Sequence, residues 1–392
     1  MTITQDTMDT VQPPADRRHF RVAIICALPR EFNAVALLFD QFWDENGDRY
    51  GKANKDLNYY ITGRIGEHNV VLATLPKMGN TSAAGVAAGL RMSYTGLSFA
   101  MLVGICGGVP QIDGSDAFLG DVVISKSIVQ YDYGKKYPGH FAVTSTVDTI
   151  GSANSDLRSL LAVLETDLMR DRLQDEASRH LKGLQEAAKK KRRGAKYPYP
   201  GAEQDKLFPP TYSHRHHGCC SVCSDDQNKF CEAASKESCA AVKCDEGNLV
   251  LRERPASSGE TFTPEISFGR IGSGNTVMKS GKDRDRIAIE HDLIAFEMEG
   301  AGSCDQIECI VVKGICDYAD SHKNDTWQDF ASATAASVMK AIVGRYTFQD
   351  EDRGPTLSKD QRSLTARSVD SNSFGGKVFI NQGDVGGNMT FM

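Results

Sequence analysis

Two apolar segments in the last third of the chain end on acidic residues and then run into small or polar residues. The first segment reaches Glu297 and Glu299, and the second reaches Asp317. An apolar strand that leads directly into a helix is typical of an α/β sheet, and such sheets bind ligands at the carboxyl ends of their strands. Two carboxylates at that edge can share one pocket, in which one holds a polyol and the other handles a proton. The simpler interpretation of any one of these acids is a helix cap or a surface charge.

A third acid follows the first apolar run of the chain. Residues 20–26 are rich in apolar and β-branched side chains, and Pro29 suits the first turn of the helix that follows. Glu31 therefore lies at another junction between a strand and a helix. A further buried-type strand ends in a glycine-rich turn, where Gly107 and Gly108 either allow close approach of a ligand or simply form a tight turn. Strands that alternate with helices in this way predict an α/β domain with a central sheet.

Composition excludes several classes of function. The net charge of −6 and the isoelectric point near 5.9 give no indication of a nucleic-acid partner. No apolar run is long enough to span a membrane. Residues 1–18 are polar and contain two prolines, which predicts a disordered leader rather than a secretory signal. We therefore expect a cytoplasmic protein whose cysteines are thiols or metal ligands.

The α/β pattern is interrupted from about 150 to 265. This segment holds three histidines and six cysteines between His214 and Cys244. Cys220 and Cys223 have the spacing of zinc ligands, but no second pair of this kind follows. A structural zinc ion is one interpretation, and unligated thiols in a variable insertion are the favoured one. No other cofactor is expected.

Five motifs together resemble the nucleoside phosphorylase and nucleosidase superfamily, which includes methylthioadenosine/S-adenosylhomocysteine nucleosidase. The motifs occur in the order of the superfamily and cover about 20–140 and 265–348: 25–31 (ICALPRE), 104–108 (GICGG), 271–275 (IGSGN), 296–299 (FEME) and 314–320 (GICDYAD). The longer string from Gly314 to Asn324, with Trp327, is most similar to fungal members that form the N-terminal effector domain of large immune-type receptors. The resemblance implies nucleoside metabolism, a small-molecule purine ligand and a homo-oligomer.

The resemblance also implies the fold and the domain boundaries. The expected fold is a single α/β domain over 19–348, with a mixed, twisted central sheet flanked by helices and a cysteine-rich insertion at about 150–265. Residues 349–392 are expected to form a flexible tail with a glycine- and asparagine-rich, β-prone end.

Three acids take catalytic roles by this resemblance. Asp317 matches the residue that protonates or hydrogen-bonds purine N7, and apolar neighbours such as Ile315 and Tyr318 would favour its neutral, proton-donating form. Glu299 matches the residue that grips the ribose hydroxyls and offsets the developing positive charge. Met298 would pack on the ribose, and the adjacent Glu297 is a weaker candidate for substrate contact.

The nucleophile separates two enzyme classes. Phosphorylases of the superfamily hold phosphate with arginines, one of them after the first strand, whereas this chain has Arg30 followed by Glu31 there. A carboxylate repels phosphate and can polarise water, and Glu31 matches the position that orients water in the nucleosidases. Hydrolysis is therefore favoured over phosphorolysis, although Arg30 keeps phosphorolysis open. A third alternative is an effector module that senses a nucleoside without turnover.

The substrate is less well defined. The aromatic residue that follows the Ser-Gly-Asp motif of bacterial nucleosidases is missing after Ser273 and Asn275, so Phe296 or Tyr318 would have to contact the base. The basic stretch that includes Lys279 and Arg284 could receive a 5′ phosphate or triphosphate, which would make the substrate a nucleotide such as ATP or dATP. The alternative is a solvated helix start whose charges pair with each other.

Overall fold

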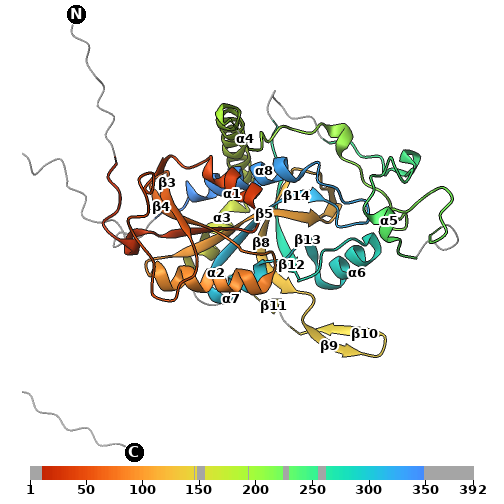
Figure 1. Ribbon diagram of the computed structural model, residues 1–392, viewed down its shortest axis with the longest axis horizontal. Helices are drawn as coiled ribbons and strands as arrows, with labels where there is room; N and C mark the ends of the chain where they lie inside the picture. The colour runs from red at the N-terminus through yellow and green to blue at the C-terminus, as the bar shows by residue number, and fades with distance from the viewer. Residues whose placement is uncertain are drawn as a thin grey trace, which may run out of the picture. The chain divides into compact units, whose positions relative to one another are not determined.

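The computed structural model describes residues 11–144, 146–147, 155–192, 194–223, 229–254 and 262–347. Within them the chain forms a mixed sheet of ten strands flanked by helices (Figure 1). The strands of this sheet are β1 (Val22–Cys26), β2 (Gln41–Phe42), β3 (Tyr60–Ile65), β4 (His68–Thr74), β5 (Phe99–Gly108), β8 (Val122–Gln130), β11 (Thr146–Val147), β12 (Ile266–Ser273), β13 (Leu293–Glu297) and β14 (Cys309–Asp317). The predicted α/β fold with a mixed central sheet is confirmed.

Part of the sheet closes on itself. β14 pairs in parallel with β5 and antiparallel with β8, while β13 joins β5 to β12 and β12 joins β8. These five strands therefore form a ring. β1 and β4 extend the sheet in parallel from β5, and β3 and β2 follow as antiparallel strands. All nine residues of β14 are buried, as expected of a strand covered on both faces.

Helices cover both faces of the sheet. Those of the common core are α1 (Pro29–Ala36), α2 (Asn80–Ser93), α6 (Gly281–His291), α7 (Gly300–Gln306) and α8 (Gln328–Val343). α8 is rich in alanine and buried along almost its whole length, because it packs against β5, β14 and α1 on one side and an insertion helix on the other. Two short hairpins, β6 (Gln111–Ile112) with β7 (Ser115–Asp116) and β9 (Gly134–Tyr137) with β10 (His140–Val143), project from the sheet.

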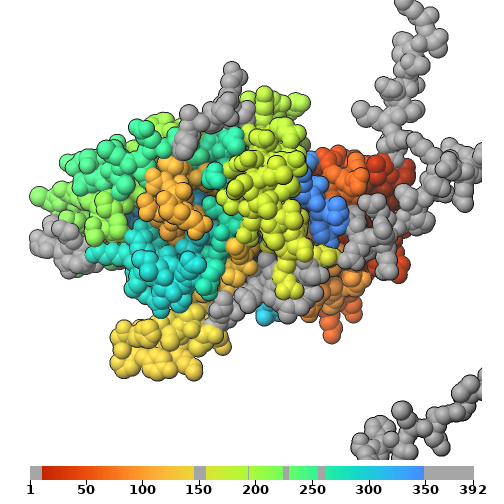
Figure 2. Space-filling model, turned by 180° about the vertical axis from the view of Figure 1, so that it is seen from behind, coloured from red at the N-terminus to blue at the C-terminus, as the bar shows by residue number. Residues whose placement is uncertain are grey.

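The insertion is partly helical. It contains α3 (Ser155–Leu164), α4 (Asp167–Lys190) and α5 (Glu232–Ser235), besides 3₁₀ turns at Ala202–Gln204 and Glu246–Asn248. α4 packs on α8, so the charged sequence after the leucine stripe is an ordered helix. Figure 2 shows the green segment that follows α4 beside α6, in cyan. The described residues up to Tyr346 form one compact unit that includes this insertion.

The structure describes only part of the predicted leader and none of the predicted tail. Residues 1–10 of the predicted leader and the predicted tail, 349–392, lie outside the described residues. Residues 11–16 lead into a 3₁₀ turn at Arg17–His19, and the Tyr50 hydroxyl donates to the carbonyl of Pro14 at 3.1 Å. Within the part of the chain that the structure describes, the helices are too short or too polar to cross a bilayer.

Candidate active site

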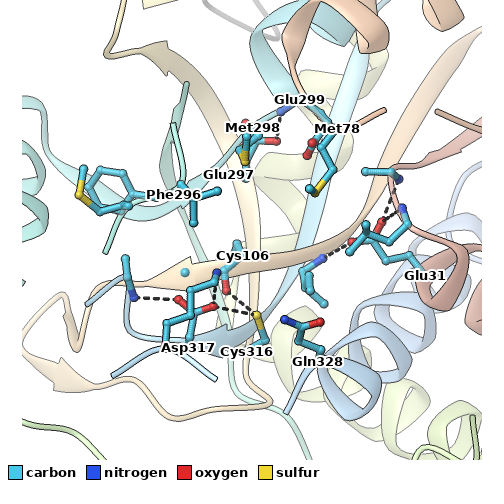
Figure 3. Close-up of a pocket in the computed structure, with 18 of the residues that line it drawn as sticks. Glu31, Met78, Cys106, Phe296, Glu297, Met298, Glu299, Cys316, Asp317 and Gln328 are labelled. Carbon is cyan, nitrogen blue, oxygen red and sulfur yellow. Dashed lines mark hydrogen bonds and ion pairs between the residues drawn. The ribbon is translucent and has the colours of Figure 1, made fainter. Parts of the chain in front are cut away.

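A cavity of about 280 Å³ lies where the carboxyl ends of β1, β5, β13 and β14 converge. Figure 3 shows Glu31 and Asp317 on different sides of it, with Glu299, Met298 and Met78 at a third side. The cavity is lined by Ala27, Leu28, Glu31, Met78, Ile105, Cys106, Gly107, Thr276, Val277, Met278, Phe296, Glu297, Met298, Glu299, Cys316, Asp317, Ala319, Lys323, Asp325 and Gln328. The three acids that the sequence places at strand ends thus share one pocket.

Glu31 is held in place by backbone N–H groups. One carboxylate oxygen accepts from the amides of Ala27 and Leu28, each at 2.8 Å, and the other accepts from Ile105 at 2.9 Å. A side chain at Gly104 would overlap this carboxylate, which explains the glycine. Burial raises the pKa of Glu31, while the charge of Lys313 opposes that rise. The result is a fixed, buried carboxylate at the cavity wall, suited to accept a proton from water.

A buried lysine connects the two acids of β13. The ammonium of Lys313, on β14, lies 3.3 Å from Glu299 Oε2 and 3.7 Å from Glu297 Oε2. Burial alone would lower the pKa of Lys313, but the surrounding carboxylates outweigh burial and raise it, so the lysine is a cation. Glu299 also accepts from the Gly79 amide at 3.1 Å. Glu299 is therefore anchored from two sides with its carboxylate at the cavity.

Glu297 serves the local backbone. Its two carboxylate oxygens accept from the amides of Glu299 and Gly300 at 2.9 Å, at the start of α7. Burial raises its pKa, and Lys313 counteracts that effect. Because these oxygens are already occupied, Glu297 lines the cavity mainly as the cap that orients Glu299.

Asp317 is paired with a cation. Its Oδ2 lies 2.6 Å from the ammonium of Lys323 and accepts from Cys316 Sγ at 3.1 Å, and its Oδ1 accepts from the Ala319 amide at 2.9 Å. Ala319 has a φ of 51°, a left-handed conformation uncommon for alanine. Gly107 leaves room for this turn, because a Cβ there would lie 2.8 Å from Ala319 Cβ. Asp317 therefore contacts a cation, Lys323, where the sequence predicted mainly apolar neighbours.

The remaining wall is apolar. It is formed mainly by Met78, Val277, Met278, Phe296 and Met298, and it offers a surface for a flat base and a sugar. Phe296 packs edge-on against Tyr131, with ring centroids 5.5 Å apart. The structure therefore leaves Phe296 as the aromatic residue available to the base among the described lining residues.

Tyr318 lies away from the cavity, contrary to the expectation that it could contact the base. Its hydroxyl donates to Asp205 Oδ1 at 2.6 Å and accepts from Arg252 at the same distance. Asp205 and Arg252 belong to the insertion, which lies outside the five motifs. The orientation of the Tyr318 side chain is therefore set by residues that the motifs do not include. Burial, with the nearby charge of Asp205, raises the pKa of Tyr318.

Ser273 and Asn275 lie behind the wall and hold α2. The Ser273 hydroxyl donates to Asn80 Oδ1 at 3.0 Å and accepts from the Ala301 amide at 3.1 Å. Asn275 Oδ1 accepts from the Asn80 amide at 3.1 Å. These contacts position the turn whose Gly79 amide binds Glu299. Gly108, predicted beside Gly107, is likewise outside the lining.

The basic side chains predicted to face a phosphate lie outside the cavity. Arg284 is buried and donates to the carbonyl of Tyr318 at 2.7 Å and to Asp285 at 2.6 Å. Lys279 is exposed and follows Met278 in the chain. Arg30 forms an ion pair with Asp329 at 3.0 Å, at the start of α8. Among the described residues that line the cavity, Lys323 is the one cation, and it is paired with Asp317.

Residues 21–184 match the family model of the phosphorylase superfamily. Over these residues the chain is similar to the phosphorylase superfamily. This confirms the resemblance that the motifs predict.

A fungal relative covers most of the chain. This chain is 31% identical over 349 residues to a nucleotide-binding leucine-rich repeat (NLR)-like protein of Hyaloscypha variabilis. The match takes in 88% of this chain and 31% of that protein, so the chain spans about a third of the relative's length.

Solved structures with similarity to this chain include two kinds of bacterial enzyme. The futalosine hydrolase of Helicobacter pylori has 15% identity and a TM-score of 0.47 over 83% of this chain and 98% of its own. The methylthioadenosine/S-adenosylhomocysteine nucleosidase of Neisseria meningitidis, in complex with methylthio-immucillin-A, has 15% identity and a TM-score of 0.46 over 83% and 99%.

Two lysines of the candidate site were not predicted from the sequence. Lys313 interrupts an apolar strand, and this position could have indicated its role, because a lysine inside a buried strand needs an anionic partner. Lys323 follows Asp317 by six residues in a polar loop, where a lysine looks like an ordinary surface residue. Met78 and Gln328, also in the lining, come from helix starts that the motifs do not include.

Proposed function

We propose that this chain is a purine nucleosidase, which hydrolyses the N-glycosidic bond of a purine nucleoside or nucleotide and releases the free base. One observation carries the proposal: a buried carboxylate, Glu31, faces the same cavity as an anchored Glu299 and the Asp317–Lys323 ion pair. The superfamily match of 21–184 supports this choice of reaction.

Each group has a distinct role in the proposed reaction. Glu299 accepts hydrogen bonds from the ribose hydroxyls and stabilises the positive charge that develops on the sugar. The Asp317–Lys323 pair lies where the base would be, and Lys323 can donate a proton or hydrogen bond to the purine as the bond between C1′ and nitrogen breaks. The electron pair of that bond stays with the base. Water adds to C1′, and Glu31 accepts the proton that the water loses.

Water is favoured over phosphate as the nucleophile. An oxyanion would have to enter next to Glu31 and Glu299, and the described lining offers it only a lysine that Asp317 already neutralises. Arg30, which kept phosphorolysis open at the level of the sequence, is turned to Asp329. These contacts support hydrolysis rather than phosphorolysis.

The substrate class includes nucleotides such as ATP or dATP in this proposal. Lys279 is exposed directly after cavity-lining Met278, where it can meet a 5′ phosphate, whereas Arg284 is committed to the fold. The match to an NLR-like protein supports a place for this chain within a larger protein of that kind. We propose that it acts there as the effector part of an immune-type receptor, in the cytoplasm. We also propose that the chain forms a homo-oligomer. In it, the β9–β10 hairpin of a neighbouring copy would complete the site with His140 or Tyr137.

The first test is the identity of the products. Incubation with ATP, adenosine and methylthioadenosine, each with and without inorganic phosphate, is expected to release free base and free sugar at the same rate in both conditions. Chromatography separates the free sugar, which is ribose for adenosine and a 5′-substituted ribose for the other two substrates, from the corresponding sugar 1-phosphate. Arg30→Gln should leave the rate within about twofold of the parent, because Arg30 has no contact with the cavity. Turnover that requires phosphate would assign a phosphorylase, and binding without turnover would assign a sensing module.

A second test concerns protonation of the leaving base. Lys323→Met is expected to reduce kcat on purine substrates by about 10²-fold or more, the usual size of a general-acid contribution. The same variant should hydrolyse p-nitrophenyl riboside at nearly the parent rate, because that leaving group departs without a proton. Equal losses on both substrates would mean that Lys323 acts only in holding the fold. Lys282→Met, an exposed lysine at the start of α6, is the matched control.

A further inference from the structure

The insertion brings cysteine and histidine side chains together at two places, and the first lies entirely within it. Donor atoms of His216, Cys220, Cys223 and Cys231 all lie within 4.8 Å of one another. His216 Nδ1 is 3.6 Å from Cys223 Sγ and 3.7 Å from Cys231 Sγ, and both of these cysteines are buried. We call these four residues the first Cys/His cluster.

A second Cys/His cluster comprises His214, Cys239, Cys244 and His322. His214 Nδ1 lies 3.5 Å from the sulfur of Cys239 and 3.5 Å from that of Cys244, and His322 comes within 4.8 Å of both His214 and Cys244. The other ring nitrogen of His214 contacts backbone carbonyls at 2.9 and 3.1 Å, which turns Nδ1 toward the cysteines. Such an outer hydrogen bond is typical of a histidine that binds a metal through its other nitrogen.

His322 has an unusual environment. Its ring is stacked on Phe208, with centroids 4.0 Å apart, and only 7% of the residue is exposed. Both ring nitrogens are buried without a hydrogen-bond partner in the described part of the chain, and the nearest carboxylate oxygen, of Asp320, is 3.8 Å away. A buried nitrogen without a partner is unfavourable, because it gives up its hydrogen bonds to water and gains none in return. Coordination of a metal ion by one nitrogen would remove this cost for that nitrogen.

The distances match a tetrahedral metal site. Zinc binds cysteine sulfur at about 2.3 Å and histidine nitrogen at about 2.0–2.1 Å, which places a sulfur and a nitrogen of one tetrahedron about 3.6 Å apart. Isolated thiol–imidazole hydrogen bonds can have similar lengths, but they join donors only in pairs. Four donors lie close together in the first cluster, and three, His214, Cys244 and His322, lie close together in the second. Cys239 joins the second cluster through its contact with His214. Thiolate and imidazole ligands together favour zinc over magnesium or calcium.

We propose that each Cys/His cluster binds one zinc ion. The sequence favoured unligated thiols because it shows only one pair with zinc-ligand spacing. The fold supplies the rest: His216 precedes that pair, Cys231 returns to it, and His322 comes from the loop after β14. Together the clusters take up five of the six cysteines of the insertion and leave Cys219 exposed.

The second centre would connect the insertion to the candidate active site. His322 is next to Lys323, whose ammonium pairs with Asp317, and the His322 amide donates to Asp320 at 2.8 Å. An ion on His322 would fix the loop that carries Lys323 to the cysteines of the insertion. His322 is a positioning residue in this view, and this consequence rests on the proposed function, whereas zinc binding itself does not.

Metal content tests the zinc sites without any assay of activity. Mass spectrometry of the full chain, purified without chelators, is expected to find two zinc ions per chain. Cys223→Ser and the pair Cys239→Ser, Cys244→Ser should each lose one ion, and Cys219→Ser should keep both. A zinc content near zero, or loss from Cys219→Ser equal to that from Cys223→Ser, overturns the proposal.

Two further measurements guard against variants that fail to fold. Replacement of zinc by cobalt in the unsubstituted chain should give the visible absorption of tetrahedral cobalt with sulfur ligands, and octahedral bands would contradict the assignment. His322→Cys, which keeps a ligand, should retain two ions and the nucleosidase rate, whereas His322→Ala should retain one ion and lose about tenfold or more in kcat. If neither variant has any activity on nucleosides, the metal count still decides the zinc proposal by itself.

Discussion

Replacing Glu31 by glutamine is expected to lower kcat by about 10²–10⁴-fold, the range for loss of a general base. Glutamine keeps the shape of the side chain and can still accept from the Ala27 and Leu28 amides, but it cannot take a proton from water. Substrate affinity, measured by calorimetry with a non-hydrolysable analogue, should change little. Glu290→Gln, an exposed glutamate on α6, is the matched control and should keep the parent rate.

The dependence of kcat/KM on pH should also reveal the ionisation of Glu31. The reaction needs ionised Glu31, so kcat/KM should fall as the pH decreases through the pKa of this carboxyl group. Because burial raises that pKa, the fall should begin above the ordinary range of glutamate. The acid limb should disappear in Glu31→Gln, leaving a low and flat rate. A mutant that keeps both the parent rate and the acid limb would remove Glu31 from the mechanism.

Replacing Lys313 by methionine is expected to have the largest effect on stability. Methionine fills a similar volume but leaves Glu297 and Glu299 buried next to each other without a cation. Breaking a buried ion pair on one side typically costs about 3–5 kcal/mol, which should appear as a lower free energy of unfolding in urea. The deficit should shrink at acidic pH, because protonation of Glu297, whose pKa burial already raises, removes the uncompensated charge.

A surface lysine provides the comparison for this experiment. Lys126 lies on β8 and pairs with Glu165 at 2.8 Å, but half of its side chain is exposed. Lys126→Met is therefore expected to cost about 0–1 kcal/mol. If Lys313→Met were as mild as this control, the buried lysine would not be the element that holds the two acids in place.

The parts of the site that depend on local pattern could be predicted from the sequence. Apolar strands followed by helix starts place Glu31 and Asp317 at one edge of the sheet, because β1 and β14 are parallel to β5 and bring their carboxyl ends together. Glu299 reaches the same cavity from β13, which pairs antiparallel with the end of β5. The sequence pattern that predicts each acid lies within a few residues of it. The three acids can therefore be found without knowing which distant residues they contact.

The parts that depend on distant contacts could not be predicted. Arg284 sits in a charged stretch that suggests a solvated helix, yet it is 1% exposed because the carbonyl of Tyr318 accepts its guanidinium. Tyr318 follows Asp317 directly, but Asp205 and Arg252 of the insertion turn its ring away from the cavity. Residues brought together from far apart in the chain decide both cases, and one sequence contains no local signal for them.

The ring formed by β5, β13, β12, β8 and β14 has a consequence for how such a domain can diversify. A strand inside a closed ring has hydrogen-bonded neighbours on both sides, so it cannot slip in register without breaking both ladders. The acids at the ends of β13 and β14 are therefore insulated from changes in the segments that connect the strands. Related proteins could therefore change residues 276–278 of the cavity lining, or the insertion between β11 and β12, without moving these acids. Such changes could bring another substrate or another regulatory ligand, while the catalytic carboxylates stay the same.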